Sequence, residues 1–210
     1  MRRLAAAALA VVPVLAVAGC GGDAGVADPP RADVEDVEGD GLDAAALAGP
    51  VAEMRRATTR YLTDVAAAEA DGYTVITPMM PDMGVHFLDP EVTGFDPAAP
   101  PILVYLPADD GWQLGAVEWV FPEEPDEPPL PGAEYGEFAA ACHYEDGTFV
   151  PEPDEAACAP QGPDSGAAFG FWHPDLVTLH VWVWCPNPDG LFAGTNPLVA
   201  PYNDRPLPST

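Results

Sequence analysis

The sequence of 210 residues contains no lysine and only two serines, Ser165 and Ser209. All seven basic residues are arginines, and they face 34 aspartates and glutamates, which gives a formal net charge of −27 with neutral histidines. A surface of this sign repels nucleic acid phosphates and anionic lipid headgroups, so we expect no nucleic acid partner. The scarcity of serine argues against a serine hydrolase. The sequence also lacks a GxSxG elbow, a glycine-rich phosphate loop and an HExxH zinc motif.

The longest apolar run lies at the N-terminus and is too short for a stable membrane span. Two arginines precede the apolar run at 4–17, and two small residues then precede Cys20. This order predicts a cleavable export signal over 1–19. The ending VAGC resembles the lipobox of bacterial lipoproteins, which implies that Cys20 receives a diacylglyceryl thioether and an N-acyl chain. We therefore expect a cell-membrane protein, lipid-anchored through Cys20 on the extracytoplasmic side.

Composition divides the remaining chain into a tether, one domain and a tail. Residues 20–48 are rich in glycine, proline and acidic residues and contain no aromatic residue, which predicts a disordered tether. Residues 49–200 form one domain's worth of chain. The proline-rich segment at 201–210 is expected to be a loose tail.

The domain opens with the one strong helix pattern, between Pro50 and Gly72. Apolar residues recur there at spacings of three and four from Val51 to Ala68, and proline suits a first helical position. Strand patterns then occur at 73–77, 84–88, 102–106, 112–121 and 177–184, while the Pro- and acid-rich 122–170 is expected to be mostly surface loops. The sequence thus predicts an α+β fold: one N-terminal amphipathic helix packed on a mainly antiparallel sheet or small barrel.

Four strand segments carry distinctive motifs: MGVHFLDP (83–90), PPILVYLP (100–107), LGAVEWV (114–120) and TLHVWVWCPNPDGLFAGTNP (178–197). The helix before them ends in ADGY (70–73). These segments resemble a family of uncharacterised bacterial secreted proteins, which share a helix ending in ADGY, a Met-Gly-x-His aromatic strand, a Val-Glu-aromatic strand and a Leu-His-x-Trp strand with Asn-Pro turns. The resemblance covers most of 60–197 and implies no particular activity, because none is established for the group.

The candidate site consists of three polar residues inside apolar or aromatic strands: His86, Glu118 and His180. A buried carboxylate without a partner would cost several kcal/mol, so Glu118 needs a cation or hydrogen-bond donors nearby. Two imidazoles and a carboxylate suit a transition metal, copper or zinc, and could also act as a metal-free acid–base group. Side chains alternate between the two faces of a strand. Alternation therefore predicts that Glu118 shares a face with Trp112, Leu114, Ala116 and Val120. In the same way, His180 is expected on the face of Thr178, Trp182 and Trp184, and His86 on that of Gly84 and Leu88.

Three interpretations of the site remain open at this level. The protein is a metal- or small-ligand-binding lipoprotein, a metal-dependent enzyme with Glu118 as general base, or a cell-envelope interaction domain without an active site. In the last case the histidines are hydrogen-bonded core residues and Glu118 pairs with an arginine of the first helix, Arg55, Arg56 or Arg60.

Sulfur ligands add second-tier candidates. Met80, Met83 and His86 are spaced by three, and thioether with imidazole suits copper. For the cysteines of the domain we expect a disulfide between Cys142 and Cys158, with Cys158–Cys185 as the alternative. In the first case Cys185 is a free thiol, either buried or an additional metal ligand. His143 and His173 are expected to be surface residues or second-tier ligands.

Overall fold

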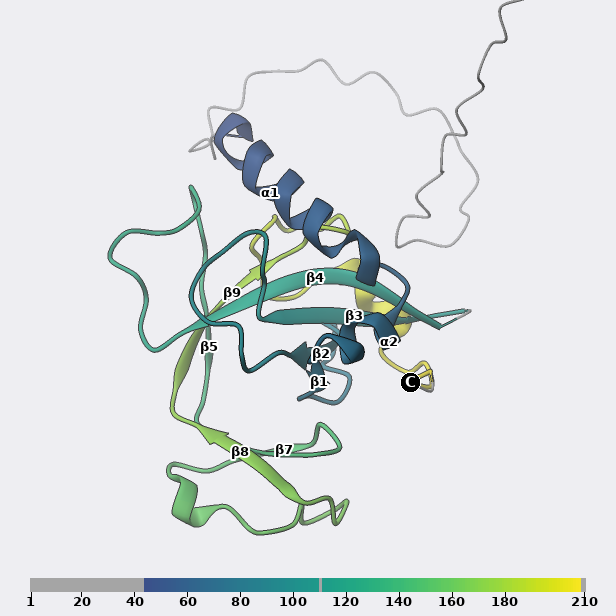
Figure 1. Cartoon of the computed structure of the whole chain (residues 1–210), viewed down its shortest axis with the longest axis vertical. Coiled ribbons are helices and arrows are strands. Elements are labelled where there is room, and N and C mark those ends of the chain that lie inside the picture. Colours follow the sequence, from purple (N-terminus) through teal and green to yellow (C-terminus); the bar gives the residue numbers. More distant parts are fainter. Residues whose placement is uncertain (1–43, 110, 209–210) are drawn as a thin grey trace, which may run out of the picture.

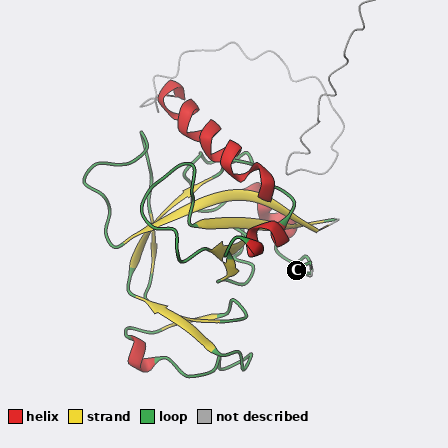
Figure 2. Ribbon diagram, in the orientation of Figure 1, coloured by secondary structure: helices red, strands yellow, loops and turns green. Residues whose placement is uncertain are grey.

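The computed structural model describes residues 44–109 and 111–208. The predicted signal peptide, Cys20 and most of the predicted tether therefore lie outside the described residues. Within these ranges the fold is mainly antiparallel sheet with few helices (Figure 2). None of the helices in the described part of the chain has the length and apolar character needed to cross a bilayer.

The elements follow one another from a helical N-terminal part to a long series of strands (Figure 1). The helices are α1 (Ala44–Thr58) and α2 (Val65–Ala70), with 3-10 turns η1 (Thr59–Tyr61), η2 (Glu155–Ala157) and η3 (Pro197–Tyr202). The strands are β1 (Thr74–Val75), β2 (Val85–Leu88), β3 (Ile102–Ala108), β4 (Gly111–Phe121), β5 (Gly136–Phe138), β6 (Ala141–Tyr144), β7 (Phe149–Pro151), β8 (Phe169–His173) and β9 (Leu176–Val181).

The strands form two open antiparallel sheets. The larger has the order β1-β2-β3-β4-β9-β5 and the smaller the order β7-β6-β8. Only Pro174 and Asp175 separate β8 from β9, so these two strands connect the sheets directly (Figure 1). The sequence did not decide between an antiparallel sheet and a small closed barrel. The described strands form open sheets and not a barrel.

The predicted single helix is interrupted. The helical run begins at Ala44 and contains Pro50 in its interior, and α1 ends at Thr58. The hydroxyls of Thr58 and Thr59 donate to carbonyls four residues earlier, at 2.7 and 2.6 Å, which is the back-bonding that weakens a helix. Asp64 then caps a new helix, α2, by accepting a hydrogen bond from the Ala67 amide at 3.0 Å.

The larger sheet buries side chains on both of its faces. One face packs against the helices through Leu103, Val117 and Trp119, together with Met54 of α1. The opposite face carries a second apolar cluster that includes Val104, Ala116 and Trp182. Both clusters use alternate residues of the same strands, as the pleat of a sheet requires.

A β-bulge in β4 contradicts the predicted row of side chains around Glu118. Tyr105 of β3 pairs with Leu114, while its neighbour Val104 pairs with Ala116, so Gly115 is an extra residue in β4. An extra residue reverses the alternation beyond it. Trp112 and Leu114 therefore face the helices, and Ala116, Glu118 and Val120 face the other way. Trp184, expected beside His180, also packs on the helix side, where its indole N–H donates to Thr58 Oγ1 at 3.0 Å.

The segment 122–170 is not simply surface loops, because it forms β5 and the whole of the smaller sheet except the end of β8. The predicted disulfide between Cys142 and Cys158 is confirmed, with a Cα–Cα distance of 5.7 Å. It ties β6 to the loop that follows η2. Alternating apolar and polar positions in this segment are few, and its strands of three to five residues are too short for their periodicity to be recognised.

Candidate metal site

Strand register brings the three predicted residues together. Glu118 and His180 are direct cross-strand partners on β4 and β9. His86 lies on β2, where it pairs with Val104 of the intervening strand β3. All three project from the same sheet face, and one potential ligand atom of each lies within 4.8 Å of the others. The predicted convergence is therefore what the structure shows.

The partner of Glu118 is His86 and not an arginine. The His86 Nε2 atom lies 3.2 Å from Glu118 Oε2, and both side chains are almost completely buried. The three arginines of the first helical segment bond elsewhere, so the predicted alternative of a helix arginine for Glu118 is wrong. Arg55 donates to the Val183 carbonyl at 2.6 Å, Arg56 pairs with Glu53 at 3.0 Å, and Arg60 pairs with Asp71 at 2.5 Å.

Thr77 holds the other side of the His86 ring. Its hydroxyl oxygen accepts a hydrogen bond from the His86 backbone amide at 2.9 Å and lies 3.0 Å from His86 Nδ1. A hydroxyl can donate to a bare Nδ1 or accept from a protonated one. His86 Nε2 is therefore free to act as a donor to Glu118 or as a ligand to a metal, without loss of the contact to Thr77.

His180 is the unusual member of the group. It is 3% exposed, and neither ring nitrogen has a hydrogen-bond partner. Burial lowers the pKa of His180 to about 4, although the Glu118 carboxylate acts in the opposite direction. Burial raises the pKa of Glu118, but hydrogen bonds from His86 and Thr178 and the proximity of the His86 and His180 imidazoles outweigh it, so its pKa is lowered. His180 as a neutral imidazole and Glu118 as a carboxylate are the protonation states in which these groups bind metals.

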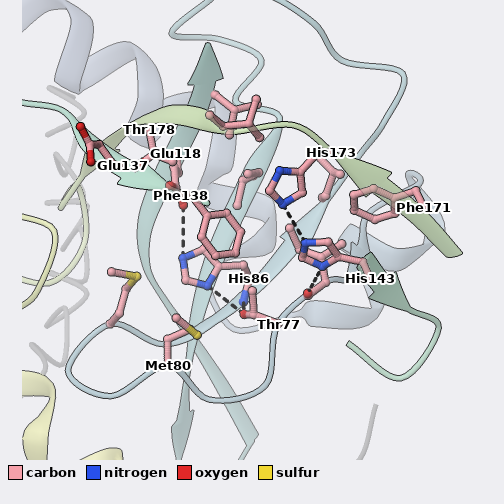
Figure 3. A pocket seen from close by; sticks show the side chains of 16 residues that line it. Thr77, Met80, His86, Glu118, Glu137, Phe138, His143, Phe171, His173 and Thr178 are labelled. Atoms are coloured by element: carbon pink, nitrogen blue, oxygen red, sulfur yellow. Dashed lines mark hydrogen bonds and ion pairs between the residues drawn. The ribbon is translucent and has the colours of Figure 1, made fainter. Parts of the chain in front are cut away.

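A cavity of about 300 Å³ opens onto Glu118 and His86 (Figure 3). It lies between the larger sheet and the smaller one, and most of its wall is apolar, with Met80 and Met83 on one side. The predicted second-tier methionines thus share a cavity with His86. Its apolar wall includes Ile76, Leu88, Ile102, Val120, Phe138, Phe171 and Leu176.

Cys185 does not behave as predicted. It is not a free cysteine, and it is completely buried in the apolar cluster with Ile76 and Val104. The chain turns after β9, where the amide of Cys185 donates to the Gly115 carbonyl at 3.0 Å. Cys185 is also not among the residues whose ligand atoms converge at the site, so the predicted additional sulfur ligand is not available from this residue.

His143 and His173 are the site residues that the sequence did not place. They were expected to be surface residues or second-tier ligands, and the structure shows them 1% and 9% exposed, with both lining the same cavity. His143 lies on β6 and His173 on β8, and their Nε2 atoms are 3.1 Å apart (Figure 3). The only signal in the sequence was that each histidine has an aromatic neighbour. Tyr144 follows His143, and Phe171 and Trp172 precede His173.

The chain matches no known protein family, no curated protein and no solved structure. The resemblance of its strand motifs to uncharacterised bacterial secreted proteins therefore stays a prediction. The functional argument rests on the geometry of the site itself.

Proposed function

We propose that this protein is a metal-binding lipoprotein of the cell envelope. His86, Glu118 and His180 bind a divalent transition metal at the inner end of the apolar cavity. The observation that carries the proposal is His180, a buried imidazole with two unpartnered nitrogens directly opposite a buried carboxylate. A buried polar group without a partner costs free energy unless something absent from the bare chain satisfies it.

The donor set favours zinc or copper. Two imidazole nitrogens and one carboxylate oxygen form the ligand set of many sites with an open coordination position. Ligand atoms around a tetrahedral ion lie about 3.4 Å apart for bonds of about 2.1 Å. The present spread of up to 4.8 Å must therefore contract. His180 can move without breaking a hydrogen bond, because its ring makes none.

The hydrogen bond between Thr77 and the ring of His86 also supports a metal at this site. A histidine that binds a metal usually donates its other N–H to a polar group, which fixes the orientation of the ring. Thr77 Oγ1 lies in that position behind His86. The cavity onto which His86 and Glu118 open has a mostly apolar wall, so we propose that a small, largely apolar molecule would be the ligand that reaches a metal bound there.

The N-terminal helix is a scaffold in this proposal. Met54 and Leu47 of α1 belong to the cluster on the sheet face opposite the site. The helix thus packs against the strands that carry Glu118 and His180, and in this proposal it supplies no ligand.

The proposal is tested by metal analysis of the purified protein. We expect one tightly bound equivalent of zinc after removal of all metal with a chelator and readdition of Zn(II). The variant His180→Phe should lose this equivalent, because phenylalanine fills the buried space without a ligand atom. Elemental analysis after gel filtration measures the stoichiometry.

Glu91→Gln provides the matched control. It makes the same chemical change at an exposed carboxylate that is not part of the site. This variant should keep the zinc equivalent. Absence of stoichiometric metal from the wild-type protein, or equal zinc in His180→Phe, would contradict the proposal and favour the cell-envelope interaction domain.

The membrane anchor is tested separately. Because dual acylation is expected at Cys20, the wild-type protein should partition into the detergent phase of a Triton X-114 extraction. Cys20→Ala should move it to the aqueous phase or leave an uncleaved precursor, whereas Glu91→Gln should partition like the wild type. Equal detergent partitioning of Cys20→Ala would show that the lipobox interpretation is wrong.

A further inference from the structure

The pair formed by His143 and His173 has a hydrogen-bond pattern that fixes the tautomer of both rings. His143 Nδ1 lies 2.7 Å from the carbonyl oxygen of Ile76, and His173 Nδ1 lies 2.6 Å from that of Pro174. A carbonyl oxygen only accepts hydrogen bonds. Each Nδ1 therefore carries the proton and donates it to its carbonyl.

This assignment leaves two lone pairs facing each other. In a neutral imidazole with a proton on Nδ1, the Nε2 atom is an acceptor. The two Nε2 atoms are 3.1 Å apart, a distance at which two acceptors repel unless a cation lies between them or on one of them. The bare pair is thus incomplete: it requires either an additional proton or a metal ion.

The surroundings of His143 disfavour an additional proton on that ring. The ring of His143 is stacked on Phe171, with centroids 4.6 Å apart and planes 2° apart, and Phe149 lies on it at 5.5 Å. Phe138 packs on His173 at 5.1 Å. Burial among these rings lowers the pKa of His143 to about 4, although the hydrogen bond to Ile76 acts in the opposite direction. The aromatic rings also hold both imidazoles in place for a ligand that bridges them.

We propose that the cavity contains a second metal position, between Nε2 of His143 and Nε2 of His173, which takes copper as Cu(I). Two nitrogens bound to one tetrahedral ion lie about 3.4 Å apart, close to the separation of the pair. The wall of the same cavity includes the thioethers of Met80 and Met83. Imidazole together with thioether is a donor set that selects copper.

The second position shares no residue with the site at Glu118, so it does not depend on that proposal. The chain has four histidines, and all four belong to these two groups. Three of them line the cavity, and His180 lies behind Glu118 as its cross-strand partner. A metal titration read through histidine resonances therefore reports on the two positions alone.

The experiment is an anaerobic titration of the purified protein with Cu(I) against a colorimetric Cu(I) chelator. We use the double variant His86→Gln/His180→Gln, in which the first site is disabled, and the same protein with the additional change His173→Gln. The double variant should take one equivalent of Cu(I) from the chelator, and the triple variant should bind it more than about 100-fold more weakly. The zinc analysis of the wild-type protein tests the site at Glu118 separately, so a wrong proposal for that site would be recognised without this titration.

A second measurement needs no substitution. In 15N spectra of the wild-type imidazoles, Cu(I) is diamagnetic and should shift the Nε2 resonances of His143 and His173 while their Nδ1 atoms stay protonated. The proposal is overturned if the double variant binds no Cu(I), or if the spectra show an imidazolium in this pair that Cu(I) leaves unchanged. Equal binding by the double and triple variants would overturn it as well.

Discussion

Glu118→Gln will abolish the metal-dependent stabilisation of the protein while it leaves the metal-free protein folded. At a zinc concentration 100-fold above the dissociation constant, the wild type should gain about 2.7 kcal/mol of unfolding free energy. A neutral amide is a poor metal ligand, so the glutamine variant should gain almost nothing. Thermal unfolding with and without Zn(II) measures the difference, and the exposed control Glu91→Gln should keep the full gain.

Glu118→Leu separates the role of the carboxylate in folding from its role in binding. Glutamine can still accept hydrogen bonds from His86 and Thr178, and so its cost to the metal-free protein should be about 1 to 2 kcal/mol. Leucine leaves the buried Nε2 of His86 without an acceptor, and its cost should be about 3 to 5 kcal/mol. Equal zinc-dependent stabilisation in the wild type and both variants would show that Glu118 has only a structural role.

Gly84→Ala is the second change for which we expect a large effect. Gly84 precedes β2 with φ of +133°, a backbone conformation that residues with a side chain rarely adopt. A Cβ at this position would lie 2.7 Å from the carbonyl oxygen of Tyr105 and 2.9 Å from the side chain of Val104. The neighbouring backbone cannot withdraw without loss of the pairing between β2 and β3. Backbone strain and overlap together should cost about 3 to 5 kcal/mol.

Gly94→Ala is the matched control for this prediction. Gly94 also has positive φ, +76°, but a Cβ there would meet nothing within 4 Å. Its substitution should cost about 1 kcal/mol, from backbone strain alone. Urea unfolding of both variants gives the comparison, and zinc affinity should fall only in Gly84→Ala, because His86 lies two residues further along the chain. Equal destabilisation by the two substitutions would contradict the overlap argument.

Local patterns in the sequence were sufficient to single out three polar residues within apolar strands. His86, Glu118 and His180 each interrupt an apolar or aromatic strand, and side-chain alternation within a strand is a local property. The strand patterns at 84–88 and 102–106 and the disulfide between Cys142 and Cys158 were predicted for the same reason, since each depends on residues close in the chain. The identity of the partner of Glu118 was left open, because His86 and the helix arginines were both plausible from charge alone.

The face on which each side chain of β4 lies needed the tertiary structure. The bulge at Gly115 reverses the alternation within β4, so the row of Trp112 and Leu114 is not the row of Glu118. A glycine inside a strand pattern permits a bulge but does not require one, because the register also depends on how β3 packs against its neighbours.

The sequence by itself determined a mainly antiparallel fold and placed two histidines and a glutamate on strands that could share a face. Only the tertiary structure decided that His143 and His173 meet in the same cavity. They come from short strands of the smaller sheet, and 29 intervening residues separate them in the chain. This contact follows from the pairing and register of β6 with β8, and neither composition nor periodicity within one strand encodes which strands pair.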